Sequence, residues 1–560
     1  MKLRAMQADA ISWDLNELRV MASQQVASFE QLGHPAEAGE AFMNLAYAES
    51  LVGEYEAALG SWQKAIALDP QLETQPFGAL LRGRLAEQGR SWVEAGSAYR
   101  EVVDRGLEDQ NPDYVWQAHH GLARVAEAQD ERAAARLAYE AALRIRRDTM
   151  LGAPLRFGRS TFAADRAEVV ADAVAFFFSQ GDEDAAFRVL DEESGRTLRD
   201  LESRLRVSRL EGQARTTYLE RLGRYRRLKE DYAELRRAEP EGMKAVAAAL
   251  QQQKALRAEM DEAFEAAYEA LEAGSTTQVE GVSRKELQDV LQEDEALLLV
   301  AELKGRAFRF AVTSTTAAYQ QAAPEDPISS SVAALLRGRR HVYGVGPWPK
   351  DLSLSPDTSR SDLPFASLLT RTPLAPRGEA LVLSNPSGDL PFASQEGAWV
   401  SQRLKARRLD GAEADMTRVL AGLESARHLH FTGHGVGSAA DAWSAHLVLA
   451  DEQQLSLEDL VALRPKVGTV VLSGCETGKG TQLSQQEKMS LADAFLISGA
   501  KWVLASDALV PDKETQAFVQ AFYESGGLDE PATTLRTLQA QSEGPLQAVA
   551  QAFRLHGHRR

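Results

Sequence analysis

Cysteine is almost absent from this chain, since Cys475 is the one cysteine among 560 residues. A single thiol cannot form a disulfide within the chain, and sequences this poor in cysteine fit reducing compartments. The sequence therefore predicts a cytoplasmic protein that folds without disulfide bonds.

Long apolar runs and an excess of positive charge are missing as well. An apolar run such as Ala-Phe-Phe-Phe at 175–178 is far shorter than the roughly 18 residues of a membrane span. The first ten residues carry two positive charges but no apolar stretch, so we expect no signal peptide. The net charge of -18 argues against bulk binding to nucleic acid or to anionic membranes, and it suits a basic partner.

The length and the composition indicate a soluble protein of two or more domains. A chain of 560 residues exceeds what one hydrophobic core supports, and 44% hydrophobic and 26% charged residues are ordinary for a globular protein. Residues 1 to about 272 are rich in Ala, Leu, Glu and Arg and contain little proline, a composition that favours helices.

A repeated pattern of small and aromatic residues runs through this helical part. In its clearest copy two helices meet at Gly53, Ala46 and Ala58 allow close approach, Trp62 fills the groove, and Pro70 ends the second helix. Weaker copies contain Trp92, Ala95, Tyr99 and Val102, then Ala135, Tyr139 and Ala142, then Gly181, Ala185, Phe187 and Leu190.

This pattern resembles the tetratricopeptide repeat. The resemblance implies a helical solenoid over 1–195 with a concave surface for peptides or partner proteins, an activating protein or complex among them. A rigid spacer or a dimerisation surface is the alternative. Residues 196–275 then read as a long helical hairpin, in which Glu239-Pro-Glu-Gly separates a charged helix from a second helix over about 243–272.

From residue 280 the sequence changes to alternating strands and helices, which is typical of a mostly parallel sheet flanked by helices. Ser283 and Glu286 form a capping-box pattern, and a hairpin is expected to turn at Lys304-Gly305. The expected strands are 297–301, 307–313, 341–345, 379–384, 427–432, 469–473 and 502–505, and the expected helices are 394–405, 415–425, 456–463, 487–498 and 512–524.

Two reactive residues flanked by glycine follow two of these expected strands. His434 stands in Thr-Gly-His-Gly at 432–435, and Cys475 stands in Ser-Gly-Cys-Glu-Thr-Gly at 473–478. Ligands of open sheets bind beyond the carboxyl ends of the strands, and adjacent strands lie about 4.8 Å apart. Neighbouring strands would therefore bring imidazole and thiol together at one rim, with Asn385 and Asp507 beyond two further strands.

This pair is the chemistry of a cysteine nucleophile and its base. An imidazole can take the proton of a thiol and later protonate a leaving amine. Gly433, Gly435 and Gly474 are expected to let the backbone turn sharply. The amides of Gly435 and Cys475 would then face a developing oxyanion.

The paired motifs resemble the caspase-like CHAT domain, of the clan that includes caspases and separase. Further matches extend the resemblance over about 280–525, and they are Pro364-Phe-Ala, Asn385-Pro with Glu396, the helix 491–500, and the strand and loop with Val503, Ser506, Val510, Asp512 and Thr515. Helical repeats before such a domain, joined by a segment like Glu193-Ser-Gly-Arg-Thr-Leu, are a common architecture of the family. The resemblance implies a CHAT domain over 280–560, with a pseudo-subunit part over about 280–375 and a catalytic part over about 376–525.

By resemblance, His434 is the general base and Cys475 attacks a peptide carbonyl in a protein substrate, with no cofactor and no metal. The position of Asp512 resembles the acidic residue that receives a basic P1 side chain in separase-like relatives, and Asp507 is a second candidate. Asp512 could instead cap the expected helix 512–524. The resemblance also suggests a role in bacterial defence or programmed cell death.

Several alternatives remain open from the sequence. A lone cysteine after a strand can be a small buried residue, and His428, His430 and His434 could suggest zinc, although a second pair of ligands is missing. A catalytically silent scaffold, whose repeats bind partner proteins, is the rival function. Two segments depart from the family pattern: the loop 507–511, and residues 548–560, where we expect a helix or a frayed end rather than the usual strand.

Overall fold

The computed structural model describes residues 15–108, 112–151, 167–199, 201, 217, 220–225, 227–228, 231–232, 235, 243–272, 281–424, 426–437, 443, 445–463, 465–484 and 487–559. The chain forms two compact units, Met1–Asp182 and Glu183–Arg560. None of the described helices is long and apolar enough to cross a membrane.

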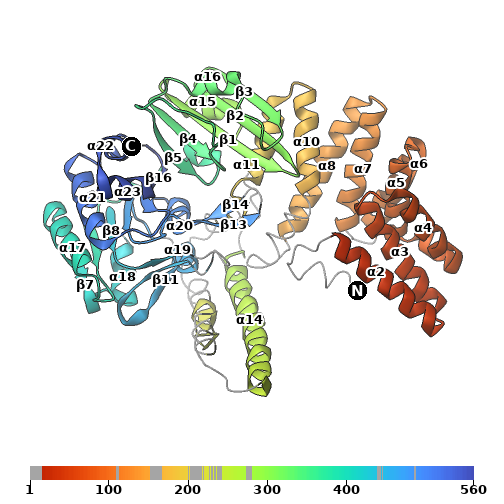
Figure 1. The fold of residues 1–560 in the computed structure, drawn as a ribbon, viewed down its shortest axis with the longest axis horizontal. Helices are drawn as coiled ribbons and strands as arrows, with labels where there is room; N and C mark the ends of the chain where they lie inside the picture. The colour runs from red at the N-terminus through yellow and green to blue at the C-terminus, as the bar shows by residue number, and fades with distance from the viewer. Residues whose placement is uncertain are drawn as a thin grey trace. The chain divides into compact units, whose positions relative to one another are not determined.

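Antiparallel helical hairpins make up the described part of the first unit, which runs from red to orange in Figure 1. Its helices are α2 (Leu15–Leu32), α3 (Pro35–Leu51), α4 (Tyr55–Leu68), the short 3-10 helix η1 (Pro70–Thr74), α5 (Pro76–Gln88), α6 (Trp92–Glu108), α7 (Pro112–Ala128), α8 (Arg132–Leu151) and α10 (Ala167–Ser179). The repeat prediction is confirmed, because α3 and α4 meet at Gly53, whose φ of 82° suits glycine.

The predicted repeat residues form the core of these hairpins. Ala46, Ala58 and Ala65 are fully buried beside Trp62. In the next copy the Tyr99 ring lies so close to two glycines that a Cβ on Gly83 or Gly121 would stand 2.7 or 2.3 Å from a ring carbon. Small residues are therefore required wherever an aromatic side chain fills the space between helices.

The second unit begins with α11 (Glu183–Glu193) and a segment joined to distant parts of the unit. The carboxylate of Asp191 is fully buried and accepts hydrogen bonds from the amides of Val282 and Ala366, at 2.9 and 2.7 Å. Glu487 accepts bonds from the amide and the hydroxyl of Thr197, at 2.5 and 3.0 Å. Two buried carboxylates thus tie residues 191–197 to elements far along the chain.

The expected helix over 243–272 is α14 (Met243–Glu272). Most of the expected helix over 196–237, the other arm of the proposed hairpin, lies outside the described residues.

One mixed sheet forms the centre of the second unit, with strand order β3-β2-β1-β4-β5-β16-β15-β12-β8-β6-β7. Its strands are β1 (Glu295–Leu303), β2 (Arg306–Thr313), β3 (Ala317–Ala322), β4 (His341–Val345), β5 (Ser359–Leu363), β6 (Ala380–Ser384), β7 (Arg407–Asp410), β8 (His428–Thr432), β12 (Thr469–Ser473), β15 (Trp502–Ser506) and β16 (Phe553–Gly557). Seven expected strands correspond to β1, β2, β4, β6, β8, β12 and β15, and the predicted hairpin turns at Lys304-Gly305. The mostly parallel sheet predicted from the alternating pattern is confirmed.

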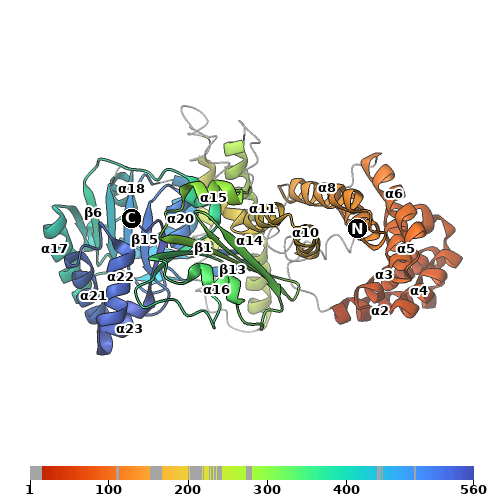
Figure 2. The same cartoon turned by 90° about the horizontal axis from the view of Figure 1, so that it is seen from above.

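Helices cover both faces of this sheet. They are α15 (Arg284–Val290), α16 (Ser330–Leu336), η2 (Ala366–Thr370), α17 (Pro391–Leu404), η3 (Gly411–Glu413), α18 (Met416–Leu423), η5 (Ala450–Glu452), α19 (Leu457–Leu463), α20 (Leu491–Ile497), α21 (Asp512–Glu524), α22 (Pro531–Gln541) and α23 (Gly544–Ala552). One core joins Val382, Val471 and Leu504 of the strands to Phe518 of α21 and Leu535 of α22. Figure 2 shows α21, α22 and α23 on one side of the sheet and α18 and α20 on the other.

Two small ribbons stand outside the main sheet. One has the order β11-β10-β9, with β9 (Gly435–Val436), β10 (His446–Val448) and β11 (Gln454–Ser456). The other pairs β13 (Thr481–Ser484) with β14 (Glu487–Met489). The expected helix over 487–498 is therefore shorter than predicted, because its first residues form β14 and the helix starts after the capping residue Ser490.

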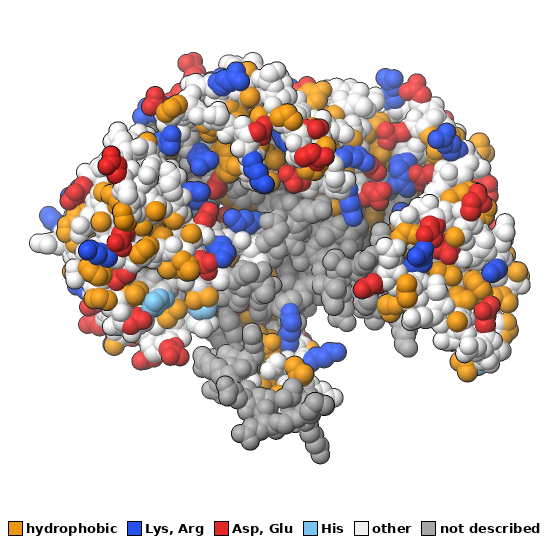
Figure 3. Space-filling model, viewed as in Figure 1, with side chains coloured by type: hydrophobic (Ala, Val, Ile, Leu, Met, Phe, Trp, Pro, Cys, Tyr) orange, Lys and Arg blue, Asp and Glu red, His pale blue; other side chains and the backbone are white. Residues whose placement is uncertain are grey.

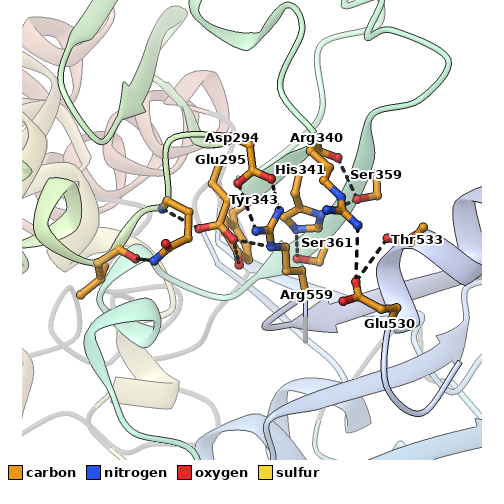
Figure 4. Close-up of polar contacts among 12 residues, drawn as sticks. Asp294, Glu295, Arg340, His341, Tyr343, Ser359, Ser361, Glu530, Thr533 and Arg559 are labelled. Carbon is orange, nitrogen blue, oxygen red and sulfur yellow. Dashed lines mark hydrogen bonds and ion pairs between the residues drawn. The ribbon is translucent and has the colours of Figure 1, made fainter. Parts of the chain in front are cut away.

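The expectation of a helix for residues 548–560 holds only to Ala552, where α23 ends, and was wrong beyond it, because Phe553–Gly557 form strand β16 inside the sheet. β16 pairs antiparallel with β15 and parallel with β5, and the hydroxyl of Ser361 donates to the carbonyl of Gly557. Figure 4 shows Arg559 beyond this strand, with its guanidinium bonded to Asp294 and Glu295. These partners lie far away in sequence, so local residue patterns could not reveal the strand.

The surface carries charges of both signs. On the face in Figure 3, acidic and basic side chains are interspersed over the described residues of each unit and form no broad patch of one sign.

Candidate active site

His434 and Cys475 stand at equivalent places beyond two paired strands. β8 and β12 are adjacent and parallel, with Thr432 opposite Ser473, and each candidate residue comes two positions later. The imidazole of His434 is 41% exposed, and Cys475 is half-buried. The tertiary structure thus brings both groups to one edge of the sheet.

The glycines beside His434 and Cys475 allow their two loops to approach each other closely, and none of these glycines adopts a left-handed backbone. Gly433, Gly435 and Gly474 are absent from the positions with positive φ, so the expected sharp turns do not use a left-handed backbone. A Cβ on Gly435 would lie 2.6 Å from the Cys475 carbonyl oxygen, and one on Gly474 would lie 2.7 Å from that of Gly433. The two loops therefore touch through their backbones, which side chains at these positions would prevent.

Residues 508–510 hold the cysteine loop from its other side. The Cys475 thiol donates to the Val510 carbonyl over 3.6 Å, and the Val510 amide donates to Sγ over 3.4 Å. The amide of Glu476 also donates to the Ala508 carbonyl, at 3.1 Å. The amide of Cys475 itself has no acceptor among the described residues, so it can serve an incoming oxygen atom.

Asp389, which the sequence analysis did not single out, contacts His434. Its two carboxylate oxygens lie 3.0 and 2.9 Å from Nε2. A carboxylate accepts but cannot donate, so Nε2 carries a proton, and in the neutral ring Nδ1 then has the lone pair. Hydrogen bonds from Ser387 and His434 lower the pKa of Asp389 and so favour the ionised form that this contact needs.

Asn385 organises the loop that carries Asp389. Its backbone is left-handed, with a φ of 44°, and its amide donates to Thr432 at the end of β8. Its side chain accepts from the Leu390 amide at 3.0 Å and donates to Ser394 at 2.9 Å. These bonds close the loop 385–390 directly beside the strand that precedes His434.

Asp512, a predicted P1 residue, is the first residue of α21 and bonds to another helix. Its Oδ2 accepts from the Phe392 amide in the first turn of α17, at 3.1 Å. It does not cap α21, whose N-cap is Pro511. Burial raises the pKa of Asp512, and among the opposing influences are the Phe392 amide and the nearby His434.

Asp507, the other P1 candidate, lies beneath the loop that follows Cys475. Its Oδ2 is 3.7 Å from Nε of Arg554, and its buried Oδ1 has no hydrogen-bond partner among the described residues. A Cβ on Gly478 would stand 3.0 Å from Oδ1 and 3.2 Å from Nε2 of His556. The structure thus separates the two aspartates, with Asp512 beside α17 and Asp507 under Gly478.

His428 and His430 are packed residues of the sheet unit. The buried Tyr523 hydroxyl bonds to both rings, and His430 also bonds to Glu396 at 2.9 Å. Burial lowers the pKa of His428 to about 3. Within the described residues, no group of three or more His, Cys, Asp or Glu side chains could hold a metal ion.

The described chain combines helical hairpins with a mostly parallel sheet that carries a histidine and a cysteine beyond the ends of adjacent strands. Residues 350–543 match the family model of the CHAT domain. This match lies inside the region where the motifs predicted a CHAT domain, so the resemblance to that domain is confirmed over residues 350–543, which follow tetratricopeptide-like hairpins in the sequence.

Known proteins match parts of this chain. Tetratricopeptide repeat protein 28 of Mus musculus is 27% identical over a region that covers 33% of this chain and 9% of that protein. Two crystal structures of the Saccharomyces cerevisiae separase–securin complex align with TM-scores of 0.35 and 0.37 at 10% identity. These alignments cover 94% and 93% of this chain, which spans about half of each matched chain, 53% and 54%.

Proposed function

We propose that this chain is a cysteine endopeptidase in which His434 removes the proton of Cys475 and the thiolate attacks a peptide carbonyl. The imidazolium protonates the leaving amine as the C–N bond breaks, and water then hydrolyses the acyl-enzyme to release the acid and regenerate the thiol. The amides of Cys475 and Gly435 stabilise the oxyanion.

The observation that carries the proposal is the equivalent position of His434 and Cys475 beyond the paired ends of β8 and β12. Asp389 supports it, because its bond to Nε2 leaves Nδ1 as the basic nitrogen. The acceptor-free amide of Cys475 supports an oxyanion site. The CHAT match supports the same chemistry by relationship.

The substrate is proposed to be a protein cleaved after Arg or Lys, with Asp512 as the P1 receptor. Asp507 suits this role less well, because one of its oxygens is buried beneath Gly478 and the other faces Arg554. Among the described residues, Asp512 is bonded only by backbone amides of the first turn of α17, and it lies near enough to His434 for its charge to be felt. A carboxylate in this place would pair with a guanidinium or an ammonium group.

The helical hairpins are proposed to bind a protein that controls cleavage, in a reducing compartment such as the cytoplasm. A role in bacterial defence follows from the family resemblance alone.

A fluorogenic peptide panel with Arg, Lys, Asp and Ala at P1 tests the proposal. We expect wild-type protein to cleave after Arg and Lys, and Cys475→Ala and His434→Ala to lose at least 1,000-fold in kcat/KM, since dyad members act as a unit. An arginyl acyloxymethyl ketone should add its mass at Cys475. Equal cleavage by wild type and Cys475→Ala would disprove the protease, whereas preferred cleavage after Asp would disprove only the role of Asp512.

A silent scaffold is the second candidate, and one observation favours it. The described hydrogen bonds of the Cys475 thiol go to Val510, and those of the His434 ring go to Asp389, so the two groups are not bonded to each other. Catalytic hydrogen bonds are often long before substrate binds, so this arrangement also fits a resting enzyme. Failure of the ketone to label Cys475, together with no peptide cleavage, would support the scaffold.

A further inference from the structure

A chain of hydrogen bonds crosses the interior of the sheet unit from β12 to α17. Nδ1 of His428 lies 2.8 Å from the Thr469 hydroxyl, and Nε2 of the same ring lies 2.8 Å from the Tyr523 hydroxyl. That tyrosine hydroxyl lies 3.0 Å from Nδ1 of His430, whose Nε2 is 2.9 Å from Oε1 of Glu396. His428, His430, Tyr523 and Glu396 are all buried. The mechanism proposed above gives none of these side chains a role.

The donors in this chain run in one direction when Glu396 is a carboxylate. Burial raises the pKa of Tyr523 and lowers that of His428 to about 3, so both side chains are neutral at pH 7. A neutral imidazole has one donor and one acceptor nitrogen, and tyrosine has one hydroxyl proton. His430 then donates to Glu396 and accepts from Tyr523. The Tyr523 oxygen accepts from His428, which accepts from Thr469. Every bond has a donor and an acceptor, and the chain ends on a negative charge.

No cation neutralises the charge of Glu396 within the described part of the chain. The side chain is 2% exposed, and no described lysine or arginine forms an ion pair with it. The ring of His430 is neutral when it accepts from Tyr523, so the carboxylate keeps its charge. The effective dielectric constant inside a protein is well below that of water. A buried charge therefore acts on neighbouring groups more strongly than an exposed one.

Asp512 lies close to this buried charge. Its Oδ2 accepts from the Phe392 amide in the first turn of α17, and Glu396 follows Phe392 by four residues, about one helical turn. Residues four apart lie on the same side of a helix. After burial, the charge of Glu396 is among the causes that raise the pKa of Asp512. Two carboxylates, one half-buried and one buried, therefore lie along the first two turns of α17.

We propose that Glu396 is a second specificity-determining residue for the P1 side chain, and that its buried charge adds to that of Asp512 in favouring Arg or Lys. The inference rests on the proposed function and deepens its P1 assignment. Asp512 contacts the P1 cation, whereas Glu396 attracts it through the electric field without touching it. The chain of donors that begins at Thr469 stabilises the ionised form of Glu396 that this role requires.

Peptides with Arg or citrulline at P1 isolate the effect of charge, because citrulline has nearly the shape of arginine and no charge. We expect the full-length wild type to prefer Arg, and Glu396→Gln to reduce the Arg-to-citrulline ratio of kcat/KM by about 10-fold, mainly through KM. Glu396→Asp keeps the charge and should retain most of the preference. The control Glu524→Gln removes an equal charge from the exposed far end of α21 and should leave the ratio unchanged.

The two substitutions at Glu396 distinguish charge from structure. Gln keeps the size of Glu and can still accept from His430, whereas Asp keeps the charge and loses length. A structural role predicts a larger loss in the Asp variant, and the proposed role predicts a larger loss in the Gln variant. A wild-type ratio in Glu396→Gln, or a ratio lost in Glu396→Asp, would overturn the proposal. Each outcome is decisive by itself, so one folded variant, checked by thermal unfolding, is enough.

Binding without cleavage separates this inference from the protease proposal. Labelled Arg and citrulline peptides are titrated against Cys475→Ala and against Cys475→Ala combined with Glu396→Gln. The second substitution should weaken binding of the Arg peptide by about 10-fold at pH 7.5 and leave the citrulline peptide unaffected. This result would support the role of Glu396 even if no peptide were cleaved. Equal binding of the Arg peptide to both proteins would contradict it.

The pH dependence of the same binding gives a sign that a structural defect would not produce. Binding of the Arg peptide should fade as Asp512 is protonated, and because Glu396 raises the pKa of Asp512, Glu396→Gln should move the midpoint to lower pH. His434, Lys513 and Glu514 also lie near Asp512, and both proteins retain them. Weaker binding with an unchanged midpoint would indicate a structural effect and would overturn the proposal.

Discussion

At the scale of single residues, the contact between Asp389 and His434 determines where the proton of the imidazole lies. The carboxylate accepts from Nε2–H and so leaves Nδ1 free to accept the proton of a thiol. The side chain of Asp389 is 61% exposed, so water competes for this bond. Asp389 is therefore a positioning residue, with a smaller effect than a buried third residue would have.

Asp389→Asn should lower kcat by about 10-fold and change KM by less than 3-fold, because the ring loses its charged partner while the P1 contacts stay. The 15N chemical shifts of His434 should report a smaller share of the Nε2–H tautomer. Asp529→Asn is the control, because Asp529 is also exposed and has no side-chain hydrogen bond among the described residues. A change in kcat without a change in tautomer would contradict the positioning role.

At the scale of elements, the arrangement of His434 and Cys475 at the edge of the sheet depends on two loops whose backbones touch with no side chain between them. The loop after β8 and the loop after β12 touch at Gly435, where a Cβ would overlap both the Cys475 carbonyl and the Thr477 side chain. Thr477 in turn bonds through its hydroxyl to the carbonyls of Leu472 and Gly474. The neighbourhood of Cys475 is therefore rigid, and added volume has no space to occupy.

Gly435→Ala should destabilise the sheet unit by about 1 to 3 kcal/mol, since overpacking forces the backbone to move. It should also abolish Cys475-dependent cleavage, because the two loops must separate. Thermal unfolding and peptide cleavage measure the two effects.

The control Gly60→Ala changes a helical glycine with open space around it. This control should keep activity and raise stability by about 0.5 to 1 kcal/mol. Full activity in Gly435→Ala would show that the loops do not need this contact.

At the scale of the whole molecule, neutral histidines inside the sheet unit link its stability to pH. Burial lowers the pKa of His341 and of His428 to about 3, and that of His558 to about 4. His341 bonds to the hydroxyls of Ser359 and Ser361, which Figure 4 shows beside the β16 end of the sheet. Each ring resists protonation when folded and accepts it when unfolded.

The sheet unit should therefore lose stability as the pH falls from about 6.5 toward 4. In this window the unfolded histidines, with ordinary pKa values near 6.5, bind protons that the folded ones exclude. Each such histidine contributes up to about 1.4 kcal/mol per pH unit, and this stability is fully present above pH 7. Chemical unfolding of the full chain at pH 7, 6 and 5 measures the slope.

His428→Asn provides the comparison, because it removes one of the three titrating rings. It should be less stable than wild type at pH 7, since His428 bonds to Thr469 and Tyr523, and its stability should fall less steeply with acid. Stability that does not change between pH 7 and pH 5 would contradict the expectation.

The sequence by itself determined the two kinds of architecture and the residues most worth testing. Buried alanines with Trp62 repeat at helical spacing, and apolar runs end at Gly433 and Gly474, so both patterns are local and can be read along the chain. The bounds of the strand 469–473 and of the helix 512–524 could be predicted from the sequence for the same reason. Such patterns reflect the burial of nearby side chains, which residue type largely controls.

Only the tertiary structure decided what surrounds the thiol and the imidazole. Asp389 reaches His434 across two strand ends, Asp512 bonds to the first turn of α17, and β16 enters the middle of the sheet. Val510 contacts Cys475 through backbone atoms, which every residue type shares. These contacts join residues that are far apart in sequence, and backbone partners leave no trace in residue identity, so the folded chain alone defines them.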